Sequence, residues 1–266
     1  MLPEEKFNEY VTYLIEKDEL YTIVLKNFMY YSAAESHATL ARILRRHFDD
    51  QHPERKTDAI SLLESSIDLH LNTEQYDDDY INYDHVIWAY QDLISLHWDV
   101  YNDAKKCLEL SLDALKILDF VSDDQLNFGV RGEIWYNKWY FLSQTGKEAE
   151  AIVECKAKLE EIEAKDLPYR QNSMLYYGNL FLAVTYKRQE DYLQGINYLK
   201  KVAVLTPIYD DYHKYNLPRY KEILLSQDDD PKACYEELWS FLDRINVHPT
   251  WDFDPKLIEN SDGSRK

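Results

Sequence analysis

Four small residues recur at a nearly constant spacing, each near the start of an apolar run with helical periodicity. They are Ala59, Ala104, Ala151 and Gly195. The spacings are 45, 47 and 44 residues, and Trp88 and Trp135 stand sixteen residues before the second and third of them. A small residue lets two helices approach closely, and a period of about 20 to 50 residues is typical of stacked helical pairs. The sequence therefore predicts an all-α fold, in which Ala104→Trp is expected to force one pair of helices apart.

Apolar periodicity and the turn signals between the apolar runs predict five helical pairs. The predicted helices span 33–49 and 56–71, 78–99 and 102–119, 127–144 and 147–164, 171–189 and 192–206, and 212–227 and 231–245. Gly146 is predicted to stop one helix, and Pro231 follows three aspartates at the start of another. Residues 1–32 are expected to form capping helices, because a terminal repeat would otherwise expose its apolar face. Residues 246–266 are expected to form a C-terminal tail that is partly disordered.

Over residues 33–245 this pattern resembles the tetratricopeptide repeat (TPR) family. The best match covers 176–207, although Asn179 replaces an expected aromatic residue. The residues at family positions there are Leu182, Tyr186, Tyr192, Gly195, Leu199 and Pro207. The spacing exceeds the family's repeat length of about 34 residues, so longer helices or connections must absorb the difference. The resemblance implies a right-handed superhelix (an α-solenoid) of about five TPR-like helical hairpins with an N-terminal helical cap.

The resemblance also implies a function, because TPR proteins hold a peptide or protein in a groove lined by the first helices of their hairpins. The residues of this chain at the groove positions are Ala89, Leu93, Tyr136, Tyr140, Leu180 and Val184. Some family members grip a C-terminal carboxylate with basic residues at such positions. None of the six is basic, so a carboxylate clamp is not expected.

Three tyrosines are the candidate partner-binding residues. Tyr136 and Tyr140 lie one helical turn apart, and Tyr177 belongs to the next repeat, so all three are predicted to face the groove. Tyrosine offers a large contact area with a polar tip and is enriched at binding hot spots. Asp84 and Asp92, one repeat away, are expected to flank the tyrosines. The alternative is that the tyrosines only pack adjacent repeats together.

The chain is strongly acidic, with 49 Asp and Glu against 30 Lys and Arg and a formal net charge of −19. Such a charge repels nucleic acid and anionic membranes and favours a basic or neutral partner. Between Lys56 and Lys105 there are eleven acidic residues and no basic one. An uncompensated acidic stretch suggests a basic partner for the 57–104 surface, and the alternative is a solvated face. The basic cluster around Arg42 and Arg45 is expected to form ion pairs with neighbouring acids.

No catalytic or cofactor-binding motif is recognised, so no catalytic residue, cofactor or metal ligand is predicted and the chain is not expected to be an enzyme. Cys107, Cys155 and Cys234 are widely separated and odd in number, which favours buried free thiols in a reducing cytoplasm. No run approaches the roughly 18 apolar residues of a membrane span, and the first residues lack the features of a signal peptide.

Three hypotheses follow for the function. The first is a non-enzymatic helical-repeat scaffold that binds a protein or peptide, with basic and apolar residues, in its concave groove. The second is a regulatory protein whose repeats sense a small peptide. The third is an enzyme subunit built on helical pairs. The sequence favours the first, because repeats of this kind usually bind other molecules.

Overall fold

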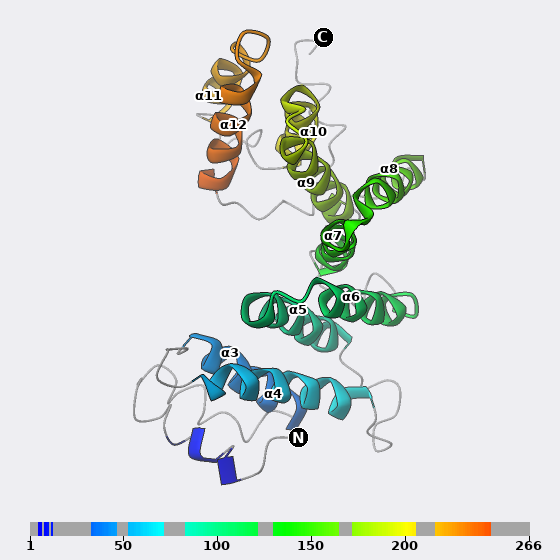
Figure 1. The fold of residues 1–266 in the computed structure, drawn as a ribbon, viewed down its shortest axis with the longest axis vertical. Helices are drawn as coiled ribbons and strands as arrows, with labels where there is room; N and C mark the ends of the chain where they lie inside the picture. The colour runs from blue at the N-terminus through cyan, green and yellow to red at the C-terminus, as the bar shows by residue number, and fades with distance from the viewer. Residues whose placement is uncertain are drawn as a thin grey trace, which may run out of the picture. The chain divides into compact units, whose positions relative to one another are not determined.

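The computed structural model describes residues 33–46, 53–71, 83–121, 130–164, 172–205 and 216–245, together with six positions between residues 5 and 12. These residues are helical or lie in short turns and bends, and no strand occurs among them (Figure 1). The all-α class is therefore confirmed. None of the helices in these ranges is both long and apolar enough to cross a membrane.

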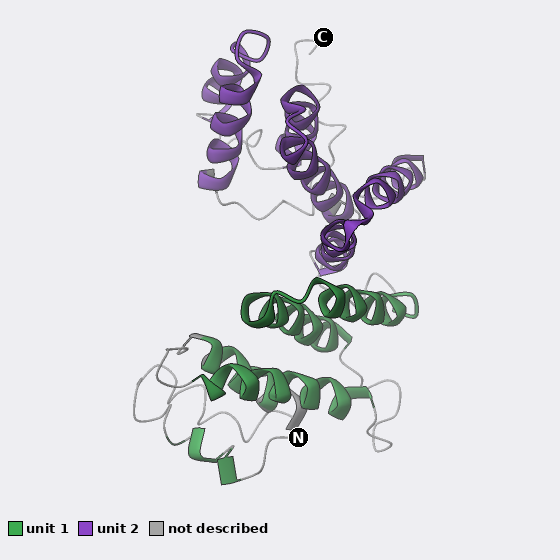
Figure 2. Cartoon of the chain, viewed as in Figure 1, with its two compact units in different colours: residues 1–126 green, residues 127–266 purple. Residues whose placement is uncertain are grey.

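The chain divides into two compact units, residues 1–126 and residues 127–266, which we call unit 1 and unit 2 (Figure 2). The labelled helices of unit 1 are α3 (Ala33–Arg46), α4 (Glu54–Leu71), α5 (Tyr83–Tyr101) and α6 (Ala104–Leu118). Within this unit each helix packs against the next one along the chain, and α3 also contacts α5.

Unit 2 continues the same alternation of helices. Its helices are α7 (Val130–Leu142), a π-helical segment (Ser143–Lys147), α8 (Glu148–Ala164), α9 (Asn172–Arg188), α10 (Tyr192–Val204), α11 (Asn216–Leu224) and α12 (Pro231–Ile245). Helix α9 contacts α7, α8 and α10, and α12 contacts α10 and α11. The packing of α7 on α9 joins the first helices of two consecutive predicted pairs.

The predicted helix ends differ from the observed ones by at most five residues. Of the predicted capping helices in residues 1–32, only six positions are described. The predicted tail, residues 246–266, lies outside the described residues.

Three residues with a left-handed backbone end the first helices of successive pairs. They are Asn102 (φ 51°), Gly146 (φ 87°) and Glu190 (φ 61°). Each is 44 residues from the next, so the turn between paired helices recurs with a constant period. The predicted stop at Gly146 is confirmed, since glycine adopts this conformation without steric cost.

An aspartate begins the second helix in three of the pairs. The carboxylate of Asp103 accepts a hydrogen bond from the backbone N–H of Lys106 at 3.0 Å, and Asp191 accepts one from Gln194 at 3.2 Å. Asp230 does the same for Ala233 at the start of α12, at 3.0 Å. Such caps satisfy backbone donors that have no partner within the helix.

The predicted position of the small residue in α6 is wrong. Ala104 is the first residue of α6 and is only half-buried, whereas Cys107 is fully buried. The thiol of Cys107 lies 3.4 Å from the carbonyl oxygen of Ile94, so Cys107 packs directly against α5. Cys107, Ala151 and Gly195 are then 44 residues apart, the same period as the turns. Ala104→Trp is therefore no longer expected to separate the two helices.

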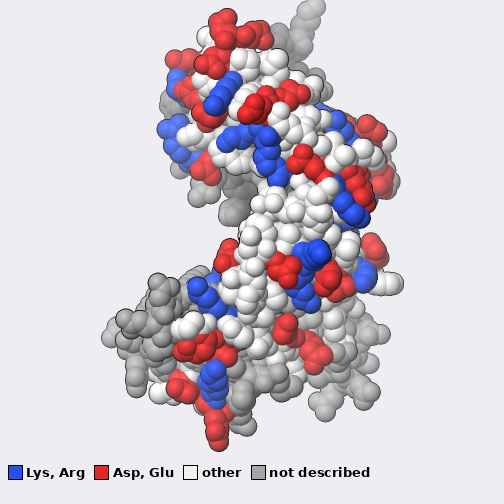
Figure 3. All heavy atoms as spheres, viewed as in Figure 1, with Lys and Arg blue, Asp and Glu red and all other residues white. Residues whose placement is uncertain are grey.

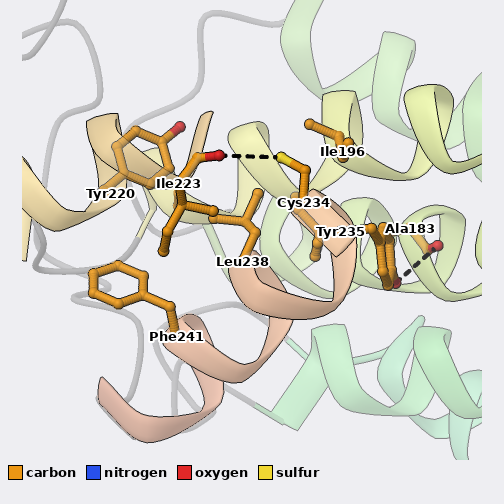
Figure 4. Close-up of a cluster of buried hydrophobic side chains, with 10 residues drawn as sticks. Ala183, Ile196, Tyr220, Ile223, Cys234, Tyr235, Leu238 and Phe241 are labelled. Atoms are coloured by element: carbon orange, nitrogen blue, oxygen red, sulfur yellow. Dashed lines mark hydrogen bonds between the residues drawn. The ribbon is translucent and has the colours of Figure 1, made fainter. Parts of the chain in front are cut away.

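A buried cluster joins α9, α10, α11 and α12 (Figure 4). Tyr235 is fully buried at its centre, and its hydroxyl donates a hydrogen bond to the carbonyl oxygen of Ala183 at 3.2 Å. The thiol of Cys234 contacts the carbonyl oxygen of Ile223 at 3.4 Å. A Cβ on Gly195 would lie 2.7 Å from the Tyr235 ring, so only glycine allows α10 to pack this closely. This cluster holds α9 in place behind the candidate site.

Candidate partner-binding site

The three predicted tyrosines meet at the packing of α7 on α9. The rings of Tyr136 and Tyr140 stack with centroids 6.1 Å apart and planes 7° apart. Tyr177 on α9 meets Tyr136 edge-on, also at 6.1 Å. All three side chains are half-buried, so part of each ring faces solvent. The structure thus brings together the residues that the helical spacing places on one face.

Tyr136 is more deeply involved in packing than its neighbour Tyr140. Its ring also lies edge-on to the buried Phe181 of α9, at 6.4 Å. Burial raises the pKa of Tyr136 to about 12, with a smaller contribution from Tyr140. Packing between repeats therefore accounts for much of the role of Tyr136, whereas Tyr140 reaches the edge of the cluster.

Charged residues at the two ends of the tyrosine cluster were not predicted. The hydroxyl of Tyr177 donates a hydrogen bond to the carboxylate of Glu133 on α7. Burial raises the pKa of Tyr177, and the nearby carboxylate of Glu133 raises it further. At the other end, the guanidinium of Arg188 lies 6.0 Å from the centroid of the Tyr140 ring. Helical spacing could have found both, since Glu133 precedes Tyr136 by three residues and Arg188 follows Tyr177 by eleven.

A polar network holds Arg188 in this position. Its guanidinium donates to the hydroxyl of Ser143 at 2.8 Å and pairs with the carboxylate of Glu148 at 3.1 Å. Gln189 donates to the same carboxylate at 2.7 Å. Because Ser143 and Glu148 flank the turn between α7 and α8, the network ties that turn to the end of α9. It also presents Arg188 toward Tyr140.

The groove positions differ between the two units. Leu180 and Val184 are half-buried and share one face of α9 with Tyr177. Ala89 and Leu93, by contrast, are buried to 0% and 1% exposure, so they do not line a groove. The 44-residue period explains the error, because the residue 44 positions before Tyr136 is Asp92.

The two predicted acids lie on α5 in unit 1. Asp92 forms an ion pair with Arg42 of α3, so its charge is compensated within the unit. Asp84 lies eight residues earlier on the same helix and is half-buried. Both acids belong to unit 1 and the three tyrosines to unit 2. That the acids flank the tyrosines stays a prediction.

The acidic stretch 57–104 is not uncompensated, contrary to expectation. Asp58 pairs with Lys6 at 2.5 Å, and Asp99 pairs with Arg45 at 2.7 Å. Arg42 and Arg45 of α3 thus pair with acids that lie about fifty residues later in the sequence. On the face drawn in Figure 3, basic side chains lie beside acidic ones in both units. Part of the negative charge of this stretch is therefore neutralised within the chain itself.

The three cysteines are free and buried, as predicted. Burial raises the pKa of the Cys107 thiol to about 11, and it also raises the pKa values of Cys155 and Cys234. A buried thiol with a raised pKa is a poor nucleophile, because the thiolate is the reactive form. Within the described ranges, no group of three or more His, Cys, Asp or Glu side chains is arranged to hold a metal ion.

No protein-family model, no curated protein and no solved structure matches this chain. The resemblance to TPR proteins therefore stays a prediction from the sequence.

Proposed function

We propose that this protein is a non-enzymatic helical-repeat scaffold that binds a protein or peptide segment. In this proposal the helical pairs form a TPR-like right-handed superhelix of about five hairpins with an N-terminal cap. Two periods of 44 residues support a tandem repeat. Asn102, Gly146 and Glu190 recur in the turns, and the small buried residues Cys107, Ala151 and Gly195 recur in the second helices. Three free, buried cysteines favour a reducing compartment such as the cytoplasm.

We assign the binding surface to the α7–α9 face, defined by Glu133, Tyr136, Tyr140, Tyr177, Leu180, Val184 and Arg188. The observation that carries the proposal is the cluster of three half-buried tyrosines bounded by an acid and a base. Aromatic rings that are only partly buried can bury more area against a partner at little entropic cost. A matching segment carries apolar anchors for the rings and a Lys or Arg for the end near Glu133.

Peptides selected from a displayed library against the purified full chain would test this proposal. Tyr140→Ala removes the ring with the smaller role in packing, so its effect on folding is expected to be small. The selected peptides should bind this variant more weakly by about 2 kcal/mol, the usual loss at a hot spot. Isothermal titration calorimetry measures the difference.

The matched control is Tyr101→Ala, which removes an exposed tyrosine from unit 1. Its affinity for the same peptides should equal that of the unmodified chain. If Tyr140→Ala bound the peptides as tightly as the unmodified chain, the binding surface would lie elsewhere. The double variant Tyr136→Ala with Tyr140→Ala is less informative, because Tyr136 also packs on Phe181.

A further inference from the structure

A lysine and two tyrosines from three helices of unit 2 meet on another side of α9. The ammonium of Lys156 on α8 donates a hydrogen bond to the hydroxyl of Tyr186 on α9, at 2.7 Å. The Tyr186 ring stacks on that of Tyr198 on α10, with centroids 5.6 Å apart and planes 6° apart. Lys201, one turn further along α10, has its ammonium 5.7 Å from the centroid of the Tyr198 ring. Two cations and two phenol hydroxyls therefore gather in one place.

The hydrogen-bonding capacity of this group is only partly used. The ammonium of Lys156 also donates to the hydroxyl of Tyr198, which leaves one of its three N–H groups. Among the residues that the structure describes, Lys156 forms no ion pair with a carboxylate. In the same ranges neither the Tyr186 nor the Tyr198 hydroxyl donates a hydrogen bond. Lys201 pairs only loosely with Glu163, at 3.9 Å. At least one N–H of Lys156 and both phenol hydrogens are therefore available to an acceptor from outside.

The protonation states suit an anionic acceptor. The hydrogen bond to Tyr186 raises the pKa of Lys156, so its ammonium stays charged at neutral pH. Burial raises the pKa of Tyr198, so its hydroxyl keeps the hydrogen that it would donate. A hydroxyl oxygen that accepts a bond from an ammonium also becomes a stronger donor, because hydrogen bonds in a chain polarise one another.

We propose that Lys156, Tyr186, Tyr198 and Lys201 form a binding site for a phosphate group, either free phosphate or a phosphomonoester. A phosphate dianion offers three oxygens and two negative charges to the two ammoniums and two hydroxyls. A carboxylate has fewer oxygens and one charge, so it would leave donors unused. A polyanion such as nucleic acid would have to lay many phosphates along a chain of net charge −19, whereas a single phosphate meets only the two ammoniums.

This phosphate site is separate from the α7–α9 face. Tyr186 follows Tyr177 by nine residues, which is two and a half turns of an α-helix, so the two side chains leave α9 in opposite directions. Occupation of one site therefore does not block the other, and the two proposals can fail independently.

Titration of the full chain with inorganic phosphate, at ionic strength held constant with chloride, tests the site. Calorimetry should show saturable binding. Lys156→Met should weaken it by roughly tenfold or more, because a charged hydrogen-bond donor is lost. The double variant Tyr186→Phe with Tyr198→Phe keeps the stacked rings and should also bind more weakly. The control Lys147→Met removes an exposed lysine paired with Glu150 and should leave the affinity unchanged.

Two further ligands identify the source of the phosphate group. Tighter binding of O-phosphoserine than of inorganic phosphate would support a phosphomonoester ligand, and equal or weaker binding would support free phosphate. Acetate that binds as tightly as phosphate would overturn the proposal, as would the absence of saturable phosphate binding. Full affinity in Lys156→Met would also overturn it. If that variant did not fold by circular dichroism, the double phenylalanine variant would decide, and its unchanged affinity would refute the site.

Discussion

Units 1 and 2 are both built of consecutive packed helices but carry different charges. Residues 1–126 contain 26 acidic and 11 basic residues, whereas residues 127–266 contain 23 and 19. In unit 1 the scarce bases bridge helices as ion pairs, such as Arg42–Asp92 and Arg45–Asp99. Both of these pairs join α3 to α5.

In unit 2 several lysines lie over aromatic rings, a contact that unit 1 also shows between Lys6 and Tyr10. Lys138 and Lys158 both approach the Trp135 ring, with ammoniums 4.7 and 5.4 Å from its centroid. Lys187 lies 5.6 Å from the centroid of the Tyr235 ring. Contacts of this kind resist salt better than exposed ion pairs, because the apolar area that the lysine stems cover does not depend on ionic strength. The comparison teaches that one helical plan can be held together by two kinds of contact.

The largest expected effect tests whether both units share the 44-residue register. Cys107→Trp in unit 1 should lower the free energy of unfolding by about 1–3 kcal/mol or more, because the indole must separate α5 from α6. Ala104→Trp, three residues earlier, should change it by less than about 0.5 kcal/mol, because that side chain begins the helix and is half-buried. Urea denaturation of the two variants measures the difference. If the two variants lost the same free energy of unfolding, Ala104 would contact α5 as closely as Cys107 does, as the sequence first predicted.

A smaller effect separates the two kinds of contact. Arg42→Ala with Arg45→Ala should destabilise the chain by at most about 1 kcal/mol for each ion pair in dilute buffer, because the pairs are partly exposed. In about 1 M NaCl this loss should largely disappear, since the Debye length falls to about 3 Å. Lys158→Ala in unit 2 removes the lysine stem over the Trp135 ring together with the pair to Glu161. It should cost a similar amount at low salt but keep more of its effect at high salt, because the lost apolar contact does not depend on ionic strength. Urea denaturation at both salt concentrations is the measurement, and identical salt dependence would contradict the comparison.

The smallest effect concerns a histidine of unit 1. Burial lowers the pKa of His97 from its ordinary value of 6.5, and Lys106 lowers it further, while Glu64 and Asp103 oppose the shift. The unfolded chain therefore binds a proton before the folded chain does, as the pH falls below about 6.5. This contribution to stability is present above that pH and is lost as the pH falls through the lowered pKa.

His97→Gln should remove the loss of stability that protonation of His97 causes at acidic pH. The contributions of other titrating groups to the pH dependence of stability should not change. Thermal unfolding between pH 7.5 and pH 5, followed by circular dichroism, compares the variant with the unmodified chain. A variant with the same pH dependence as the unmodified chain would show that another group is responsible.

The sequence predicted the helices well because their signals are local. Apolar periodicity, Gly146 and Pro231 each depend on a few adjacent residues, and the observed helix ends lie close to the expected ones. The register of α6 was missed because Ala104 is itself a small residue and lies only three positions before the buried Cys107. Asn102 has a left-handed backbone and ends α5. Asparagine also occurs in many other backbone conformations, so the sequence did not show that Asn102 ends the helix.

The candidate site was predicted only in part. The contact between Tyr136 and Tyr140 was predicted because residues three to four apart share one face of a helix. The position of Tyr177 beside them was predicted from its place in the next repeat. The compensation of Asp92 by Arg42 could not be predicted from charge counts along the chain. That ion pair joins residues fifty positions apart and exists only because α3 packs near α5.

Asn102, Gly146 and Glu190 are separated by 44 residues each, so a segment of 44 residues can be inserted or deleted between equivalent turn positions. A cut from one of these residues to the next removes a second helix together with the first helix that follows it. Removing residues 147–190, for example, would join Gly146 directly to Asp191, the cap of α10, so that a left-handed residue would again precede a capping aspartate. Gene duplication or excision in steps of this length would therefore alter the number of hairpins while each surviving helix kept its own start and stop signals.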